Sequence, residues 1–256
     1  QPSHEAGVYA QYLHPSGAPT STPVLPVRIY VMGDNVWRDE SEWPPAQVRY
    51  EPYYLRSGGR ANSLSGDGRL EEQLPGEEDP PDVYTYDPRS PVPSLGGAMI
   101  GDGAEVRPQN SVEERDDVLV YGTPPLQRDL EVTGDVTLVL HVVTPVPSTD
   151  FTAKLVDVHP NGSAYLVCDG ILRREYVRDT VARPVEIRID LWPTSYVYKR
   201  GHRIRLEVSS SNYPRFDLNS TQGNPSVDSE SKTVRQTIHH GRGSPSRLIL
   251  PIIPRN

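Results

Sequence analysis

The chain has 256 residues, 27 prolines and a formal net charge of −8. This length can bury a sizeable core, the acidic balance excludes the basic surface that binds nucleic acid or an anionic membrane, and so many prolines exclude long helices. The single cysteine excludes an intrachain disulfide. No apolar run reaches the roughly 20 residues of a membrane span. We therefore expect a soluble, cytoplasmic protein.

The first part of the chain divides into a linker and the start of a β domain. Residues 1–25 are rich in Pro, Ser, Thr, Gly and Ala, a composition typical of a linker, and we expect the domain to occupy residues 26–256. The alternation of Val27, Ile29 and Val31 predicts a half-buried strand. The segment 37–45 contains two tryptophans and ends at a proline pair, and we predict that it is not a strand.

Two long segments without strand patterning interrupt the remaining strands. Apolar alternation predicts strands near 48–55, 69–74, 83–86, 118–121, 136–142, 151–155, 164–175, 185–191, 203–208, 234–238 and 248–252, with a hairpin turn at 159–163. The intervening segments 87–117 and 211–232 are rich in Pro, Gly and polar residues. Loops of this length inside a domain often carry function, so a ligand or partner is expected there.

About ten short amphipathic strands separated by turns favour an antiparallel sandwich. The predicted fold is therefore all-β, an antiparallel jelly-roll β-sandwich. Jelly rolls of this kind resemble galactose-binding domains, which leaves a carbohydrate- or ligand-binding module as the alternative function. Tyr213, Phe216 and Tyr54 are the aromatic residues that could stack on a sugar, and Asp217 belongs to the same loop.

A search for a catalytic set gives a negative result. The Gly-x-Ser-x-Gly motif of a nucleophile elbow is absent, and Ser209–Ser211 have the polar context of a strand end. The seven histidines show no zinc-binding spacing, so we predict no metal site. Asp217 and Asn219 supply oxygen atoms, but their spacing does not match a calcium-binding loop.

Seven segments resemble, in order and spacing, one family of enzymes. They are Pro26–Gly33, Trp37–Pro44, Tyr86–Pro88 with Pro91–Gly97, Asp150–Val158, Cys168–Ile171, Gly201–Ile204 and Val208–Arg215. Together they resemble the C-terminal, non-catalytic domain of the Xaa-Pro dipeptidyl-peptidase and cocaine esterase (CocE/NonD) serine hydrolases. The resemblance covers about residues 26 to 254.

The resemblance implies a jelly-roll domain that packs on an α/β-hydrolase domain and a helical cap. These partner domains would carry the whole catalytic triad, so no catalytic residue, cofactor or metal is expected in this chain. The domain would stabilise the enzyme and help wall its active-site cleft. Members of the family cleave Xaa-Pro dipeptides or acyl esters and amides. If the partner domains are absent, the surface that they normally cover would promote self-association of this chain.

The same resemblance suggests which residues reach the cleft. Leu95 belongs to the Ser-Leu-Gly-Gly turn, and Met99 and Ile100 follow it. We expect all three to line the cleft as apolar wall residues; the alternative is that they only anchor their loop. Two interpretations are open for Trp37 and Trp43. They could anchor an interface with the hydrolase domain, or they could belong to this domain's own core. The core reading is slightly favoured, since large aromatic side chains are usually buried.

Overall fold

The computed structural model describes residues 25–99, 105–175, 183–221 and 232–255, and this part of the chain is almost entirely β-structure. It contains one short helix, α2 (Asn110–Glu113), and none of its helices is long and apolar enough to cross a membrane. The strands are β1 (Val27–Val31), β2 (Val36–Glu40), β3 (Arg49–Arg56), β4 (Arg69–Glu71), β5 (Asp82–Tyr86), β6 (Leu119–Gly122), β7 (Leu130–Val143), β8 (Ser148–Val158), β9 (Ala164–Glu175), β10 (Val185–Tyr198), β11 (Arg203–Ser209), β12 (Val234–His239) and β13 (Arg247–Ile253).

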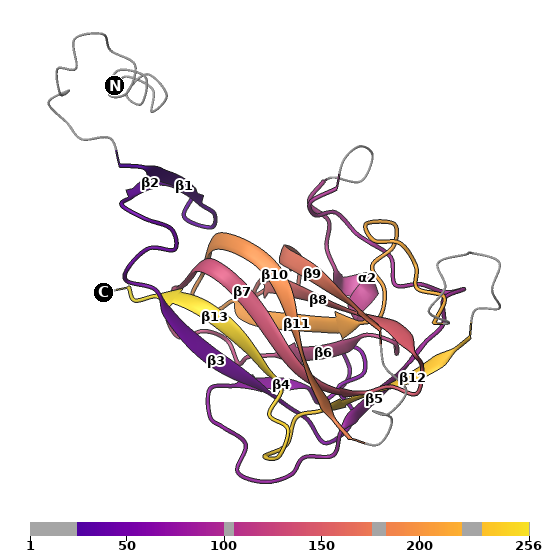
Figure 1. Ribbon diagram of the computed structural model, residues 1–256. Coiled ribbons are helices and arrows are strands. Elements are labelled where there is room, and N and C mark those ends of the chain that lie inside the picture. The colour runs from indigo at the N-terminus through magenta and orange to yellow at the C-terminus, as the bar shows by residue number, and fades with distance from the viewer. Residues whose placement is uncertain (1–24, 100–104, 176–182, 222–231, 256) are drawn as a thin grey trace, which may run out of the picture.

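Eleven of these strands form one hydrogen-bonded sheet (Figure 1). The strand order is β5-β12-β7-β13-β3-β4-β6-β11-β8-β9, and β10 pairs with β7 outside that path. Every named pairing is antiparallel except the short contact of β4 with β6. The prediction of an all-β, mostly antiparallel domain is thereby confirmed.

The sheet folds over itself, and its apolar side chains meet in between. Leu138 of β7 and Ile189 of β10 belong to the same buried cluster as Phe151 and Leu155 of β8. β10 packs across β9 without pairing with it. At the crossing, a Cβ atom on Gly170 would lie 1.9 Å from the carbonyl oxygen of Asp190, so only glycine allows this approach.

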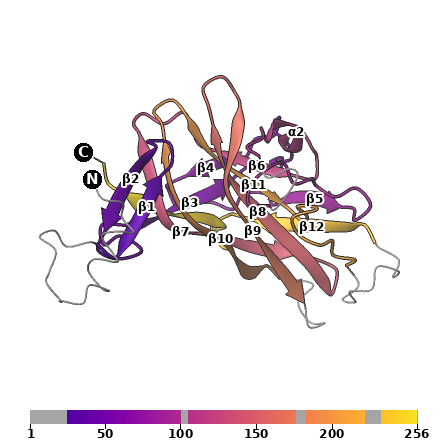
Figure 2. The same cartoon turned by 90° about the horizontal axis from the view of Figure 1, so that it is seen from above.

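Strands β1 and β2 form a separate two-stranded hairpin. In both overall views the hairpin lies at one end of the molecule, well away from α2 and from β12 (Figures 1 and 2). The hairpin meets the large sheet at β10, where the N–H of Met32 donates to the carbonyl of Ser195 and the N–H of Val197 donates to the carbonyl of Met32, each at 2.9 Å. Arg38 adds an ion pair of 2.6 Å to Glu131 of β7.

The hairpin corrects two sequence predictions. The segment 37–45 was predicted not to be a strand, yet β2 covers its first four residues. Its alternation is aromatic and charged rather than apolar, because the strand is held by pairing with β1 and not by a buried face. The core reading of the tryptophans is also wrong: the side chains of Trp37 and Trp43 are 61% and 37% exposed.

Candidate functional site

The two long loops that the sequence singled out lie side by side. The N–H of Ser94 donates to the carbonyl of Tyr213 at 2.7 Å, and the N–H of Tyr213 donates to the carbonyl of Val92 at 2.9 Å. The hydroxyl of Ser94 donates to Oδ1 of Asn212 at 2.8 Å. Residues 92–94 and 211–213 thus form one wall, which loop length alone could not reveal.

Beside this wall the structure has a cavity of about 600 Å³. Its apolar lining comes from Leu95 on the first loop, Leu166 on β9, and Leu191 and Trp192 on β10. Its charged lining includes Glu105, Arg107, Asp169 and Arg215. An apolar hollow with a few charged groups at its side is typical of a ligand-binding or domain-binding site.

A buried ion pair supports the charged side of the cavity. Nε of Arg215 lies 2.8 Å from Oδ2 of Asp169, and the Asn212 amide donates to the same oxygen at 2.9 Å. Burial raises the pKa of the Asp169 carboxyl, although Arg215 and Lys154 act in the opposite direction. Arg215 also donates to the carbonyl of Ala98, so its guanidinium joins the two loops.

Trp192 is a lining residue that the sequence analysis missed. It lies in β10 where the register shifts between Asp190 and Pro193, and its φ is +69°. Its N–H donates to Oδ1 of Asp190 at 2.8 Å, and its side chain is 64% exposed. Such a bulge turns a side chain away from its regular face. The break in alternation at Trp192-Pro193 was the available signal.

A chain of buried hydrogen bonds holds the backbone of the first loop in place at Leu95. Nζ of Lys154 donates to Oε1 of Gln109 at 3.2 Å, and Nε2 of Gln109 donates to the carbonyl of Leu95 at 2.7 Å. Lys154 also lies 3.5 Å from Glu207, whose pKa is raised to about 7 by burial. The position of Leu95 is therefore coupled to the interior of β8 and β11.

Of the three residues predicted to line the cleft, only Leu95, among those that the structure describes, lies directly in the cavity wall. Leu95 lines the cavity, and Met99 is half-buried on the same loop next to Ala98, which also lines it. Ile100 lies outside the described residues.

The residues of the alternative ligand loop, Tyr213, Phe216 and Asp217, follow the end of β11, whereas Tyr54 lies in β3. Tyr213 is 46% exposed and forms a bridge with Pro93. Phe216 is covered by the guanidinium of Arg215, 5.0 Å above its ring, and Asp217 is exposed.

Asn219, which the sequence offered beside Asp217 as an oxygen donor, is held by buried polar contacts. Asn219 is buried, and its amide donates to Ser148 Oγ at 3.0 Å and to Asp150 Oδ1 at 2.8 Å. Arg173 neutralises Asp150 with an ion pair of 2.9 Å. The side-chain oxygen of Asn219 accepts from the N–H of Thr221 at 2.8 Å and so already serves a structural contact, whereas Asp217 is exposed.

A serine, a histidine and an aspartate meet in the interior, but not in the arrangement of a catalytic triad. Ser57 Oγ lies 2.7 Å from Asp82 Oδ2 and 3.1 Å from His240 Nε2. The same Nε2 lies 2.9 Å from Asp82 Oδ2, whereas a triad histidine uses different ring nitrogens for serine and acid. His240 and Asp82 have no exposed surface and Ser57 is 4% exposed, so no substrate reaches them.

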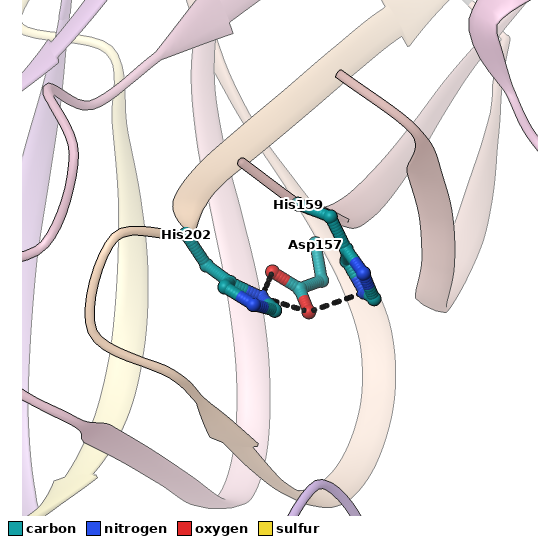
Figure 3. A group of neighbouring side chains, drawn as sticks. All are labelled: Asp157, His159 and His202. Carbon is teal, nitrogen blue, oxygen red and sulfur yellow. Dashed lines mark hydrogen bonds and ion pairs between the residues drawn. The ribbon is translucent and has the colours of Figure 1, made fainter. Parts of the chain in front are cut away.

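Two histidines and an aspartate converge at the end of β8, which the histidine spacing did not predict. Nδ1 of His202 lies 3.0 and 2.9 Å from the two oxygens of Asp157, and Nε2 of His159 lies 3.4 Å from Oδ2 (Figure 3). The hydroxyl of Tyr196 donates to Oδ2 at 2.8 Å. Burial, followed by the charge of Asp157, raises the pKa of Tyr196, so its hydroxyl remains a donor.

Comparisons with known proteins agree with the resemblance read from the sequence. Residues 20–249 match the model of the X-Pro dipeptidyl-peptidase C-terminal non-catalytic domain. The chain is 43% identical over 242 residues to a cocaine esterase of Rhodococcus sp. (strain MB1 Bresler), covering 90% of this chain and 42% of the esterase.

Two solved structures are similar over nearly the whole chain. An aminopeptidase from a marine sediment Thaumarchaeota archaeon has 26% identity and a TM-score of 0.80, covering 98% of this chain and 44% of that one. An α-amino acid ester hydrolase has 26% identity and a TM-score of 0.77, covering 95% and 43%. The chain spans less than half the length of each relative, and it belongs to the family of X-Pro dipeptidyl-peptidase C-terminal non-catalytic domains.

Proposed function

We propose that this chain packs against the α/β-hydrolase and cap domains of a serine hydrolase, stabilises that enzyme and helps wall its active-site cleft. The family match together with relatives more than twice as long carries this proposal. The jelly-roll arrangement of the sheets belongs to the same proposal, as does a cytoplasmic location, which rests on the single cysteine. The substrate would be an acyl ester, an acyl amide or an Xaa-Pro peptide.

The cavity beside Leu95 is the surface that best fits a cleft wall. It combines apolar side chains with a loop that Gln109 holds in place. Burying an apolar acyl group against such side chains contributes about 25 cal/mol per Å². Leu95, with Met99 nearby, would therefore favour substrates with a large apolar acyl group.

The hairpin β1–β2 is the surface that best fits the domain contact. Its outer face carries Tyr30 and Trp37, whose ring centroids lie 5.3 Å apart, and Arg28 lies 5.6 Å above the Trp37 ring. A two-stranded hairpin is marginally stable alone. Exposed aromatic side chains with an arginine beside them are typical of buried protein interfaces.

The test uses the full-length enzyme with Leu95→Ala, and Leu74→Ala as the control because Leu74 is 60% exposed and away from the cavity lining. We expect Leu95→Ala to lower kcat/KM about tenfold for an ester with a large apolar acyl group, since a tenfold change corresponds to about 1.4 kcal/mol of lost apolar contact. The kcat/KM for an acetyl ester should change less than about twofold. Equal losses for both esters would contradict a role in the cleft.

A second measurement separates this function from the alternative module. The chain alone should not hydrolyse esters or Xaa-Pro amides, and turnover that a serine-directed inhibitor abolishes would refute the proposal. Binding of a sugar by the chain alone, lost in Tyr213→Ala, would favour the carbohydrate-binding module instead.

A further inference from the structure

The strand register brings Asp157, His159 and His202 to one spot on the sheet. Asp157 and His159 are two residues apart at the end of β8, so both side chains leave the same face. β11 pairs with β8 with Arg203 opposite Val158, which places His202 opposite His159. The backbone is held on both sides: the N–H of His159 donates to the carbonyl of Ser163, and the N–H of His202 donates to the carbonyl of Lys199, each at 2.9 Å.

The three side chains present three ligand atoms to a common point. One ligand atom from each side chain lies within 4.8 Å of the others, and the two imidazole rings lie 4.4 Å apart, on either side of the Asp157 carboxylate (Figure 3). Ligands of a tetrahedral zinc ion lie about 3.4 Å apart when its bonds are near 2.1 Å. The separation of 3.4 Å at Oδ2 already matches this value, the separation of 2.9 Å needs to lengthen by about half an ångström, and the two imidazole nitrogens lie within 4.8 Å of each other.

The three side chains are held in fixed orientations by their neighbours, and solvent can reach the two histidines. Asp157 is 1% exposed, and the Tyr196 hydroxyl fixes its carboxylate at 2.8 Å, as outer partners of metal ligands do. The side chains of His159 and His202 are 37% and 15% exposed. An ion could thus enter from the His159 side, with a water molecule as its fourth ligand.

We propose that Asp157, His159 and His202 bind one divalent transition-metal ion, with Zn²⁺ as the best match. Two imidazole nitrogens and one carboxylate oxygen suit zinc and its neighbours, whereas Mg²⁺ and Ca²⁺ prefer oxygen ligands only. His202 would carry its proton on Nε2 and direct Nδ1 to the ion. The ion would join the β8–β9 turn to the start of β11, and this binding is independent of the proposed role in a hydrolase.

The test titrates Zn²⁺ into the full chain, purified without a metal-affinity tag and freed of metal with a chelator. We expect one ion per chain and an increase of Tm with Zn²⁺ but not with Mg²⁺. His202→Asn should weaken Zn²⁺ binding at least about 100-fold, and Tyr196→Phe about 10-fold as the loss of an orienting partner. An asparagine keeps an N–H that can donate to Asp157, so the metal-free variant should unfold like the wild type.

The control is His141→Asn, because His141 lies on β7 beside Glu186 and belongs to no ligand group among the residues that the structure describes. It should bind Zn²⁺ as the wild type does. A second ligand variant, His159→Ala, removes a partly exposed turn residue and keeps the test valid if His202→Asn unfolds. Absence of Zn²⁺ binding, or binding of equal strength in the wild type, His202→Asn and His159→Ala, would overturn the proposal.

Discussion

Trp192 combines a positive φ angle with an exposed side chain. Its φ of +69° is costly for a bulky side chain, on the order of 1–3 kcal/mol, and burial does not offset that cost because the side chain is 64% exposed. The residue remains in the wall of the cavity. We infer that a contact outside this chain, in the proposed cleft or interface, accounts for it.

Replacing Trp192 by glycine should therefore maintain or raise the stability of the isolated chain but lower the activity of the full-length enzyme. Trp192→Gly removes the strained side chain, and we expect the isolated chain to unfold at an equal or higher temperature than the wild type. Trp192→Ala keeps the positive φ and should be the less stable of the two. In the full-length enzyme both variants should lower kcat/KM. A clear fall in Tm of the glycine variant would show that Trp192 stabilises the domain itself.

Asp82 is a residue whose charge the fold stabilises. Burial raises the pKa of this carboxyl, but hydrogen bonds from His240, the Ala61 N–H, Tyr121 and Ser57 outweigh burial and leave the pKa below its usual 3.8. Because the folded-state pKa is lowered, the resulting stability is present above the unfolded-state pKa. It is lost as the pH falls through the folded-state pKa.

We accordingly expect Asp82→Asn to lower the free energy of unfolding by about 3 kcal/mol at neutral pH, as for a broken buried ion pair. The gap between wild type and variant should narrow as the pH falls from about 5 to 2. Urea unfolding at several pH values measures this gap, and the comparison removes the contributions of other carboxyl groups. A gap that stays constant with pH would contradict the role of the Asp82 charge.

At the scale of elements, the hairpin β1–β2 depends on one glycine for its attachment. Gly33 has a φ of +84°, and a Cβ atom there would lie 2.3 Å from the carbonyl oxygen of Val197 on β10. The backbone bonds between Met32 and β10 flank this close approach. Docking of the hairpin and its aromatic face thus rests on the absence of a side chain.

Gly33→Ala should release the hairpin while the large sheet stays folded. We expect a loss of about 2 kcal/mol in local stability, seen as faster amide hydrogen exchange in β1 and β2. Exchange in β7 and β8 should not change. Gly76→Ala is the matched control, since a Cβ atom at Gly76 would meet nothing within 4 Å. Equal exchange in both variants would rule out this attachment.

At the scale of the whole molecule, the exposed aromatic residues of the hairpin, together with Trp43 just after it, leave a surface that a partner domain would cover. Tyr30, Trp37 and Trp43 are 41%, 61% and 37% exposed. Exposed apolar patches promote association when their partner is absent. The isolated chain should therefore associate with itself at high concentration.

Sedimentation velocity over a concentration series measures this association. Trp37→Ser should shift the chain toward the monomer, whereas Leu74→Ser, which changes a 60% exposed residue elsewhere, should not. A chain that stays monomeric at every concentration would argue against an uncovered interface on the hairpin.

The amino-acid sequence by itself determined most of the strand segments, and it carried the resemblance to the family that the comparisons showed. Period-two alternation, as in Val185 to Leu191, is a local property of a half-buried strand, so it can be read without knowing the partner strand. The same local criterion missed β2, because pairing with β1 and not an apolar face holds that strand.

Only the tertiary structure decided where the chemistry lies. The meeting of His159 and His202 follows from the register of β8 with β11, and the exposure of Trp192 follows from a bulge against β7. Pairing between strands distant in sequence is set by the packing of the whole core. No spacing along the chain expresses it, and for this reason the cavity and the Asp157 cluster could not be predicted from residue patterns.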